Sequence, residues 1–94
     1  NLGLLSAPTG IILDNNNNLF ICDAFNNRIR RVNSVSNIIS TIANTLSNPL
    51  AITFNNISNK IYFSTSNHQI FEINLSSNNS NPLLIGGNGI RGFS

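Results

Sequence analysis

The sequence has little charge, and this limits the partners that it can serve. Charged residues make up 9% of the 94 positions, with five Lys or Arg against three Asp or Glu and a formal net charge of +2. A nucleic-acid-binding surface is normally a dense basic patch, but the only basic cluster here is Arg28, Arg30 and Arg31. The composition therefore predicts a weakly cationic surface rather than a nucleic-acid footprint.

Cysteine and long apolar runs are also scarce. Cys22 is the one cysteine, so no disulfide can form within the chain, and the cellular compartment stays undetermined. Its neighbours at 19–21 are apolar, and a lone cysteine in such a run is usually a small buried residue. No stretch approaches the roughly 18 apolar residues of a membrane span, so we expect no membrane partner.

Groups for catalysis or metal binding are few. His68 is the only histidine, and Asp14, Asp23 and Glu72 are the only carboxylates of the side chains. A Ser-His-Asp triad would need this histidine beside a nucleophile and an acid, and zinc sites gather three or four ligands. The Gly-Gly-Asn-Gly segment at 86–89 lacks the Lys-Ser/Thr of a phosphate-binding loop. We therefore expect a non-enzymatic protein with no catalytic residue, metal or cofactor.

The residues that are abundant are apolar β-formers and asparagine. Hydrophobic residues make up 40% of the chain, and 20 of the 94 residues are Asn. Disordered chains combine low hydrophobicity with high net charge, and this chain has neither. Ile and Phe favour strands, whereas Asn tolerates a positive φ and favours turns. The composition predicts a folded, mostly β protein.

The sequence repeats itself once, with a period of about 41 residues. Pro8 and Pro49 begin corresponding apolar segments that are 41 positions apart. Three further pairs keep a spacing of 41 to 43: Phe20 and Tyr62, Ile29 and Ile70, and Ile42 and Ile85. The small drift is expected if insertions and deletions fall in loops. Repeats of this length are typical of stacked supersecondary units.

Each repeat contains four short apolar segments bounded by Asn, Asp, Ser, Gly and Pro, which is the pattern of strands. The connections are short, so neighbouring strands are expected to be antiparallel. The predicted strands are 10–14, 19–23, 28–33 and 38–43 in the first repeat, then 51–55, 60–64, 69–74 and 82–86 in the second. We therefore predict two four-stranded sheets, the first within 1–46 and the second within 47–94.

A four-stranded antiparallel unit of about 40 residues, repeated in tandem, has the size of a β-propeller blade. An eight-stranded β-sandwich is the competing interpretation, and the tandem similarity at a nearly fixed period argues against it. Two blades leave a sheet face bare on each side. The missing blades would come from a longer chain or from identical copies associated head-to-tail.

The motif residues of the first repeat resemble a known family. Residues 8–14 read P-T-G-I-I-L-D, the segment 19–23 ends in Asp23, and 27–30 read N-R-I-R. This order is similar to the NHL repeat, and 39–43 and 86–94 resemble its outer strand and inter-blade linker. The second repeat keeps the apolar frame but replaces several motif residues: Leu50-Ala51 for Thr9-Gly10, Thr65 for Asp23, and His68-Gln69 for Asn27-Arg28. The resemblance implies a β-propeller, commonly six-bladed.

Four motif residues are expected to be structural. Pro8 and Pro49, which have no N–H to donate, suit the entry to an innermost strand. Gly10 would permit a close approach of two backbones at the crowded centre. Asp23 ends a strand, where its carboxylate could hold the backbone N–H groups of the next turn or pair with Arg28.

Binding is expected on one rim of the propeller, since loops on a rigid scaffold carry most recognition. A protein, a peptide or a glycan is the preferred ligand. Single-stranded RNA is the alternative, because Phe25 lies beside Arg28 and some propellers of the family that this chain resembles bind RNA. The candidate ligand-binding residues are Thr9, Phe25, Asn26, Asn27, Arg28, Ser66, Asn67 and His68, with Leu50 on the same rim.

Overall fold

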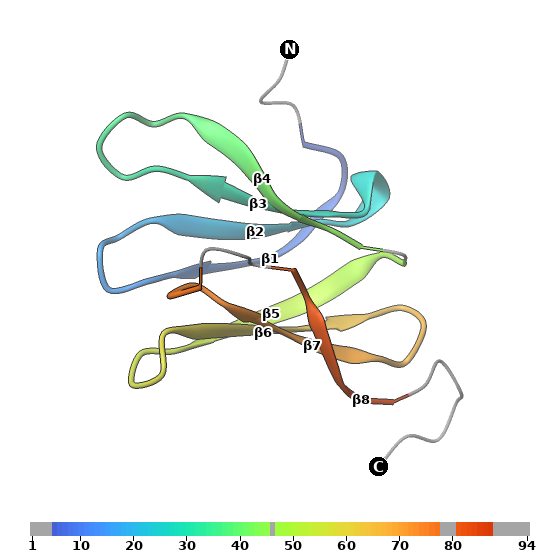
Figure 1. Ribbon diagram of the computed structural model, residues 1–94. Helices are drawn as coiled ribbons and strands as arrows, with labels where there is room; N and C mark the ends of the chain where they lie inside the picture. The colour runs from blue at the N-terminus through green and yellow to red at the C-terminus, as the bar shows by residue number, and fades with distance from the viewer. Residues whose placement is uncertain (1–4, 46, 78–80, 88–94) are drawn as a thin grey trace.

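A computed structural model describes residues 5–45, 47–77 and 81–87. The chain forms two four-stranded antiparallel sheets, each a simple meander (Figure 1). The first sheet contains β1 (Pro8–Leu13), β2 (Leu19–Asp23), β3 (Arg28–Val32) and β4 (Ile39–Asn44). The second contains β5 (Pro49–Asn55), β6 (Lys60–Thr65), β7 (Ile70–Asn74) and β8 (Leu83–Gly86). The prediction of an all-β chain with two such sheets is confirmed.

All eight predicted strands are present, and their ends differ from the predicted ones by at most two residues. The largest differences are at Pro8 and Pro49, which begin β1 and β5 rather than precede them; the pairing register shifts directly after each proline. A single 3-10 turn, η1 (Ala24–Asn26), joins β2 to β3 and was not predicted. No α-helix occurs in the described ranges. Residues 88–94 of the predicted linker lie outside those ranges.

Asparagine shapes the hairpin turns, as the sequence predicted. Asn17 and Asn59 have φ values of 64° and 56° in the β1–β2 and β5–β6 turns, respectively. In the first turn, Asp14 Oδ1 accepts the backbone N–H of Asn16 at 2.9 Å. In the second, Asn55 Oδ1 accepts the N–H of Ile57 at 3.0 Å. Short side chains that bond the local backbone replace glycine here.

The hydrophobic core lies between the two sheets. Phe20 and Cys22 of β2 meet Ile61 and Phe63 of β6 in one buried cluster, which also contains residues of β3, β4 and β7. Cys22 has no exposed surface, so its predicted burial is confirmed, and burial raises the pKa of its thiol to about 11. Four consecutive residues of β2 are buried, which explains why its sequence shows no polar alternation.

The first strands of the two sheets, β1 and β5, pack against each other. Gly10 lies in this contact, where a Cβ atom built on it would be 3.4 Å from the carbonyl oxygen of Leu50, an ordinary van der Waals distance. A requirement for glycine at this position stays a prediction. Thr9 adds a hydrogen bond across this contact, from its Oγ1 to the carbonyl oxygen of Pro49 at 3.0 Å.

The two sheets are stacked in the same orientation, so that their equivalent faces point in the same direction. Ile52 packs against the core, yet Ile11, its equivalent one repeat earlier, is 63% exposed. Conversely, Ile12 packs against the core, while its equivalent, Thr53, is exposed on the other side of the second sheet. The first sheet therefore covers one face of the second, and within the described residues no further sheet or helix covers the other face of either one.

Candidate functional site

The predicted binding residues gather at one edge of the molecule, which we call the β2–β3 rim. It contains the β2–β3 turn (24–27), the β6–β7 turn (66–69) and the starts of β1 and β5, and both turns lie on the same side in Figure 1. Backbone hydrogen bonds hold each turn to the chain entering its own sheet: Ala24 N–H donates to Ala7 O at 3.3 Å, and Ser66 N–H to Asn48 O at 2.9 Å.

The first turn presents an aromatic ring and a cation. Phe25 in η1 is 71% exposed, and Asn26 and Arg28 are also exposed. Asn27 has a left-handed backbone, with φ of 53°, and its N–H donates to Ala24 O at 3.1 Å. This conformation suits Asn better than most residues, so Asn27 has a backbone role in addition to any contact that it makes with a ligand.

The second turn repeats the backbone without the same side chains. Ser66, Asn67 and His68 are all exposed. His68 has a φ of 61°, matching its equivalent Asn27, and its N–H donates to Thr65 O at 3.2 Å. The rim therefore carries two similar turns, one with an aromatic ring and a cation and one with only polar groups.

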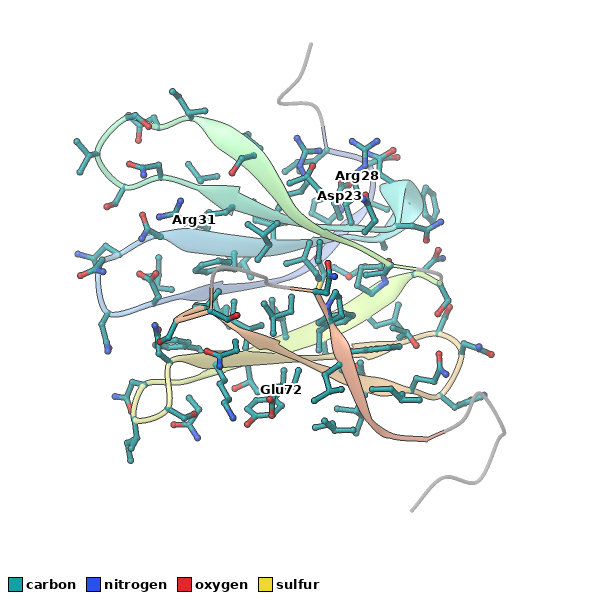
Figure 2. The ribbon with its side chains drawn as sticks, viewed as in Figure 1. Asp23, Arg28, Arg31 and Glu72 are labelled. Atoms are coloured by element: carbon teal, nitrogen blue, oxygen red, sulfur yellow. The ribbon has the colours of Figure 1, made fainter. Side chains whose placement is uncertain are left out.

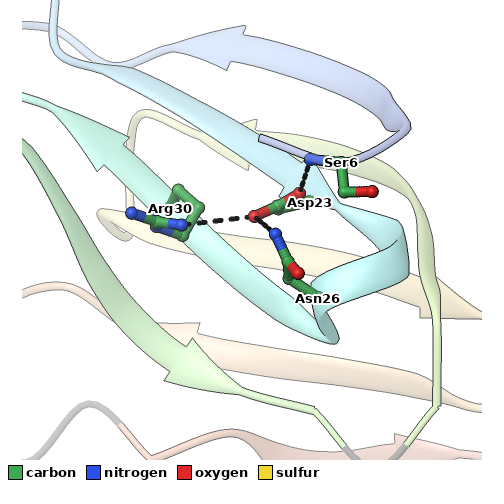
Figure 3. A network of polar contacts seen from close by, with 4 residues as sticks. All are labelled: Ser6, Asp23, Asn26 and Arg30. Carbon is green, nitrogen blue, oxygen red and sulfur yellow. Dashed lines mark hydrogen bonds and ion pairs between the residues drawn. The ribbon is translucent and has the colours of Figure 1, made fainter. Parts of the chain in front are cut away.

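Asp23 organises a buried polar network beneath the first turn (Figure 3). Its Oδ1 accepts the backbone N–H of Ser6 at 2.7 Å, and its Oδ2 accepts Asn26 Nδ2 at 2.9 Å. Arg30 completes the network, with its guanidinium 3.2 Å from Asp23 Oδ2 and both side chains almost fully buried. The carboxylate therefore ties together the entering chain, the turn and β3.

Pairing with Arg28 was one of two roles expected for Asp23, and the ion pair in the structure is instead with Arg30. Arg28 stands opposite Asp23 in the strand register, but it begins β3 and its side chain is exposed, so it can keep its hydration. Arg30 lies two residues further along the same face, inside the sheet, where a guanidinium requires an acceptor. The partner of Asp23 is therefore the buried Arg30, and not Arg28, which lies directly opposite it in the strand register.

The four motif residues lie in both sheets. Pro8 and Pro49 begin β1 and β5, Gly10 lies in the contact between these two strands, and Asp23 accepts a hydrogen bond from the entering chain at Ser6. The second sheet holds Thr65 at the position of Asp23. Thr65 Oγ1 is buried and has no hydrogen-bond partner among the described residues.

Residues 5–45, 47–77 and 81–87 contain no group of three or more His, Cys, Asp or Glu side chains that could hold a metal ion. His68 lies on the β2–β3 rim, whereas Asp14 lies in the turn at the opposite edge. Within these same ranges, no helix has the length and apolar character that crossing a membrane requires.

Sequence reasoning missed a polar hollow of about 380 Å³ at the opposite edge. We call that edge the β1–β2 rim; it contains the turns 14–18, 33–38 and 55–59 and the residues that follow β7. Arg31 and Asp14 come from the first sheet, and Asn59 and Ser77 from the second. The sequence did place Arg31 at the far end of β3, near one of two Asn-rich turns. It could not show that the two turns lie side by side, because their proximity depends on how the sheets stack.

A scan of protein-family models finds no match to this chain, and a search of curated proteins finds no match either.

Proposed function

We propose that the chain is a pair of β-propeller blades of the NHL type and serves as a non-enzymatic interaction module. Further blades would cover its bare faces, and the loops of the β2–β3 rim would bind a protein, a peptide or a glycan. The proposal rests on the sense in which the two sheets stack, together with the motif residues of the first repeat.

Same-sense stacking carries the proposal. Two sheets that form a closed sandwich turn their apolar faces toward each other and present polar faces to water. Here Ile11 and Leu13 are 63% and 57% exposed, although their equivalents, Ile52 and Phe54, pack against the core. The first sheet thus exposes the surface that is equivalent to the one the second sheet packs against the first. Successive blades of a propeller have this arrangement.

The outer face of the second sheet offers the complementary surface. It contains a shallow, mainly apolar hollow of about 310 Å³ over β5 and β6, formed in part by Ala51, Tyr62 and Ile70. Their equivalents in the first sheet are Gly10, Phe20 and Ile29, and Ile52 packs over this group inside the chain. We therefore propose that Ile11 and Leu13 of another copy, or of a similar blade, fill this hollow.

The β2–β3 rim supports an interaction role, because both of its turns are exposed and the Asp23 network holds the first of them. Phe25 can contribute apolar contact area, and Asn26 and Asn67 can donate or accept hydrogen bonds. Ligands of this rim would meet a fixed surface, since Asp23 holds η1 from below through Asn26. Fixed loops reduce the entropy lost on binding.

The stacking proposal predicts self-association of the purified chain. We expect light scattering to show species larger than a monomer, and Leu13→Asp to weaken their association at least tenfold because it places a charge in the apolar contact. The matched control is Val35→Asp, since Val35 is 91% exposed in the β3–β4 turn and should leave association unchanged. A stable, cooperatively unfolding wild-type monomer would contradict the proposal.

Single-stranded RNA remains the second candidate for the β2–β3 rim, favoured by the exposed ring of Phe25 beside the exposed Arg28. Base stacking on an aromatic ring with a nearby cation is how such strands are held. Titration with a uridine oligonucleotide at two ionic strengths separates the candidates. RNA binding weakens steeply with salt, and the absence of binding at low salt would remove this candidate.

A further inference from the structure

We propose that the polar hollow of the β1–β2 rim binds an anionic group, a carboxylate or a phosphate, through Arg31. The hollow has a volume of about 380 Å³ and lies at the seam between the two sheets. It is independent of the bare faces and of the β2–β3 rim, so it does not rest on the proposed function.

The lining of the hollow combines polar and apolar residues. Its polar members besides Arg31 are Asp14, Asn16 and Asn18 of the β1–β2 turn and Asn59 and Ser77 of the second sheet. Its apolar members are Phe20, Ile42 and Leu75. A charged group at the rim with an adjoining apolar body would therefore find both kinds of contact, which is typical of small-ligand sites.

Arg31 is the cation of this site. Its side chain is half-buried, and among the described residues it makes no hydrogen bond or ion pair. Two other cations in the sheets are paired: Arg30 lies 3.2 Å from Asp23, and Lys60 lies 3.4 Å from Glu72, whereas Arg28 is exposed at the opposite end of β3. A guanidinium presents a planar fork of donors that matches carboxylate and phosphate oxygens.

The carboxylate of Asp14 does not pair with Arg31 in place of the proposed anion. Its Oδ1 accepts the backbone N–H groups of Asn16 and Asn18, each at 2.9 Å, and its Oδ2 accepts Asn18 Nδ2 at 3.1 Å. These bonds hold the carboxylate in the turn, and no ion pair joins it to Arg31. Its charge weakens the attraction for an anion, so we expect weak binding of simple ions.

Asn16 can supply further donors to the same group. The lining residues come from both sheets, so the site exists only while the sheets are packed. The second repeat has no counterpart of Arg31, because the equivalent residue is Glu72, which pairs with Lys60. The chain therefore carries one site of this kind in the described ranges.

Titration of the full chain with sodium acetate and with inorganic phosphate, at constant ionic strength, tests the proposal. We expect saturable changes in the amide resonances of residues 14–18 and 31 with at least one anion, and the comparison shows whether carboxylate or phosphate is preferred. Arg31→Gln should lower the affinity at least tenfold, whereas Arg31→Lys should keep part of it because the charge remains.

Arg28→Gln is the matched control, since Arg28 and Arg31 lie toward opposite ends of the first sheet (Figure 2). It should bind as the wild type does. Equal losses in Arg28→Gln and Arg31→Gln would show a nonspecific charge effect and overturn the proposal, as would the absence of saturation in the wild type. Circular dichroism of each variant establishes that the sheets are intact. If Arg31→Gln misfolds, the anion affinities of Arg31→Lys and Arg28→Gln are compared instead, and a loss in Arg31→Lys alone supports the proposal.

Discussion

The two sheets have the same topology but different interiors at equivalent positions. The first holds a carboxylate, Asp23, with Arg30 as its buried ion-pair partner. The second holds Thr65 in place of Asp23 and Phe71 in place of Arg30, and Phe71 stacks on Phe63 with ring centroids 5.4 Å apart. One strand geometry is thus compatible with a polar network or an aromatic pair. The network gives in addition a fixed entry of the chain at Ser6.

The largest predicted effect comes from breaking the network of the first sheet. Asp23→Ala removes the carboxylate that pairs with the buried guanidinium of Arg30, and loss of one partner of a buried pair costs about 3–5 kcal/mol. Urea unfolding at a fixed protein concentration measures the loss. Lys60→Gln is the control, because the Lys60–Glu72 pair is partly exposed and should contribute less than about 1 kcal/mol.

The double variant Asp23→Thr/Arg30→Phe sharpens the same comparison by giving the first sheet the residues of the second. It removes both charges together, so no unpaired charge stays buried. We expect it to be clearly more stable than Asp23→Ala. A double variant that is less stable than either single change would show that the aromatic pair depends on features found only in the second sheet.

A smaller effect concerns Cys22 and its equivalent Ser64, which are fully buried and half-buried, respectively. The pKa of the Cys22 thiol is raised by burial from 9.0 to about 11. The unfolded chain therefore releases this proton first, and stability present below pH 9 is lost as the pH rises toward 11. The expected loss is roughly 2 kcal/mol.

Unfolding measured between pH 8 and pH 11 tests this expectation, with Cys22→Ala as the reference. The alanine variant lacks the titrating thiol, so the difference between the two curves isolates its contribution. Parallel curves for the wild type and Cys22→Ala would contradict the assigned pKa.

The smallest effect is expected in the second sheet, at Thr65. Its buried hydroxyl has no hydrogen-bond partner among the described residues, and leaving such a group unpaired is unfavourable by about 1–3 kcal/mol. Thr65→Val keeps the shape and should raise the free energy of unfolding by up to about 1 kcal/mol. Thr41→Val, at an exposed position of β4, should change it very little. Destabilisation by Thr65→Val would reveal a partner for the hydroxyl.

The strands could be predicted from the sequence because each depends on local signals. Apolar segments such as 19–22 are bounded by Asn-rich turns, and Asn17 and Asn59 adopt the positive φ that the turns require. The repeat then predicted two equivalent sheets, since a segment whose strand pattern is ambiguous in one repeat has a clear strand pattern in the other.

The polar contacts could not be predicted in the same way. Arg28 and Arg30 are both within reach of Asp23 in the sequence, and the choice depends on which guanidinium loses its water. The hollow at Arg31 needs residues of both sheets, so its lining depends on how the sheets stack. The 3-10 turn at 24–26 has a weak local signal, because Asn27 marks only its end.

The contact between β1 and β5 has a consequence for the size of the assembly that we propose. A row of sheets that all point the same way has no natural last member, and growth stops only when curvature returns the row to its start. In such a row the angle between neighbouring sheets would set the curvature, and Gly10 lies in the contact between them, where an added Cβ would be 3.4 Å from the carbonyl oxygen of Leu50. A side chain larger than that of alanine at this position would press on β5, and in the proposed assembly it would therefore alter how many units complete a circle, or leave the row open as a filament.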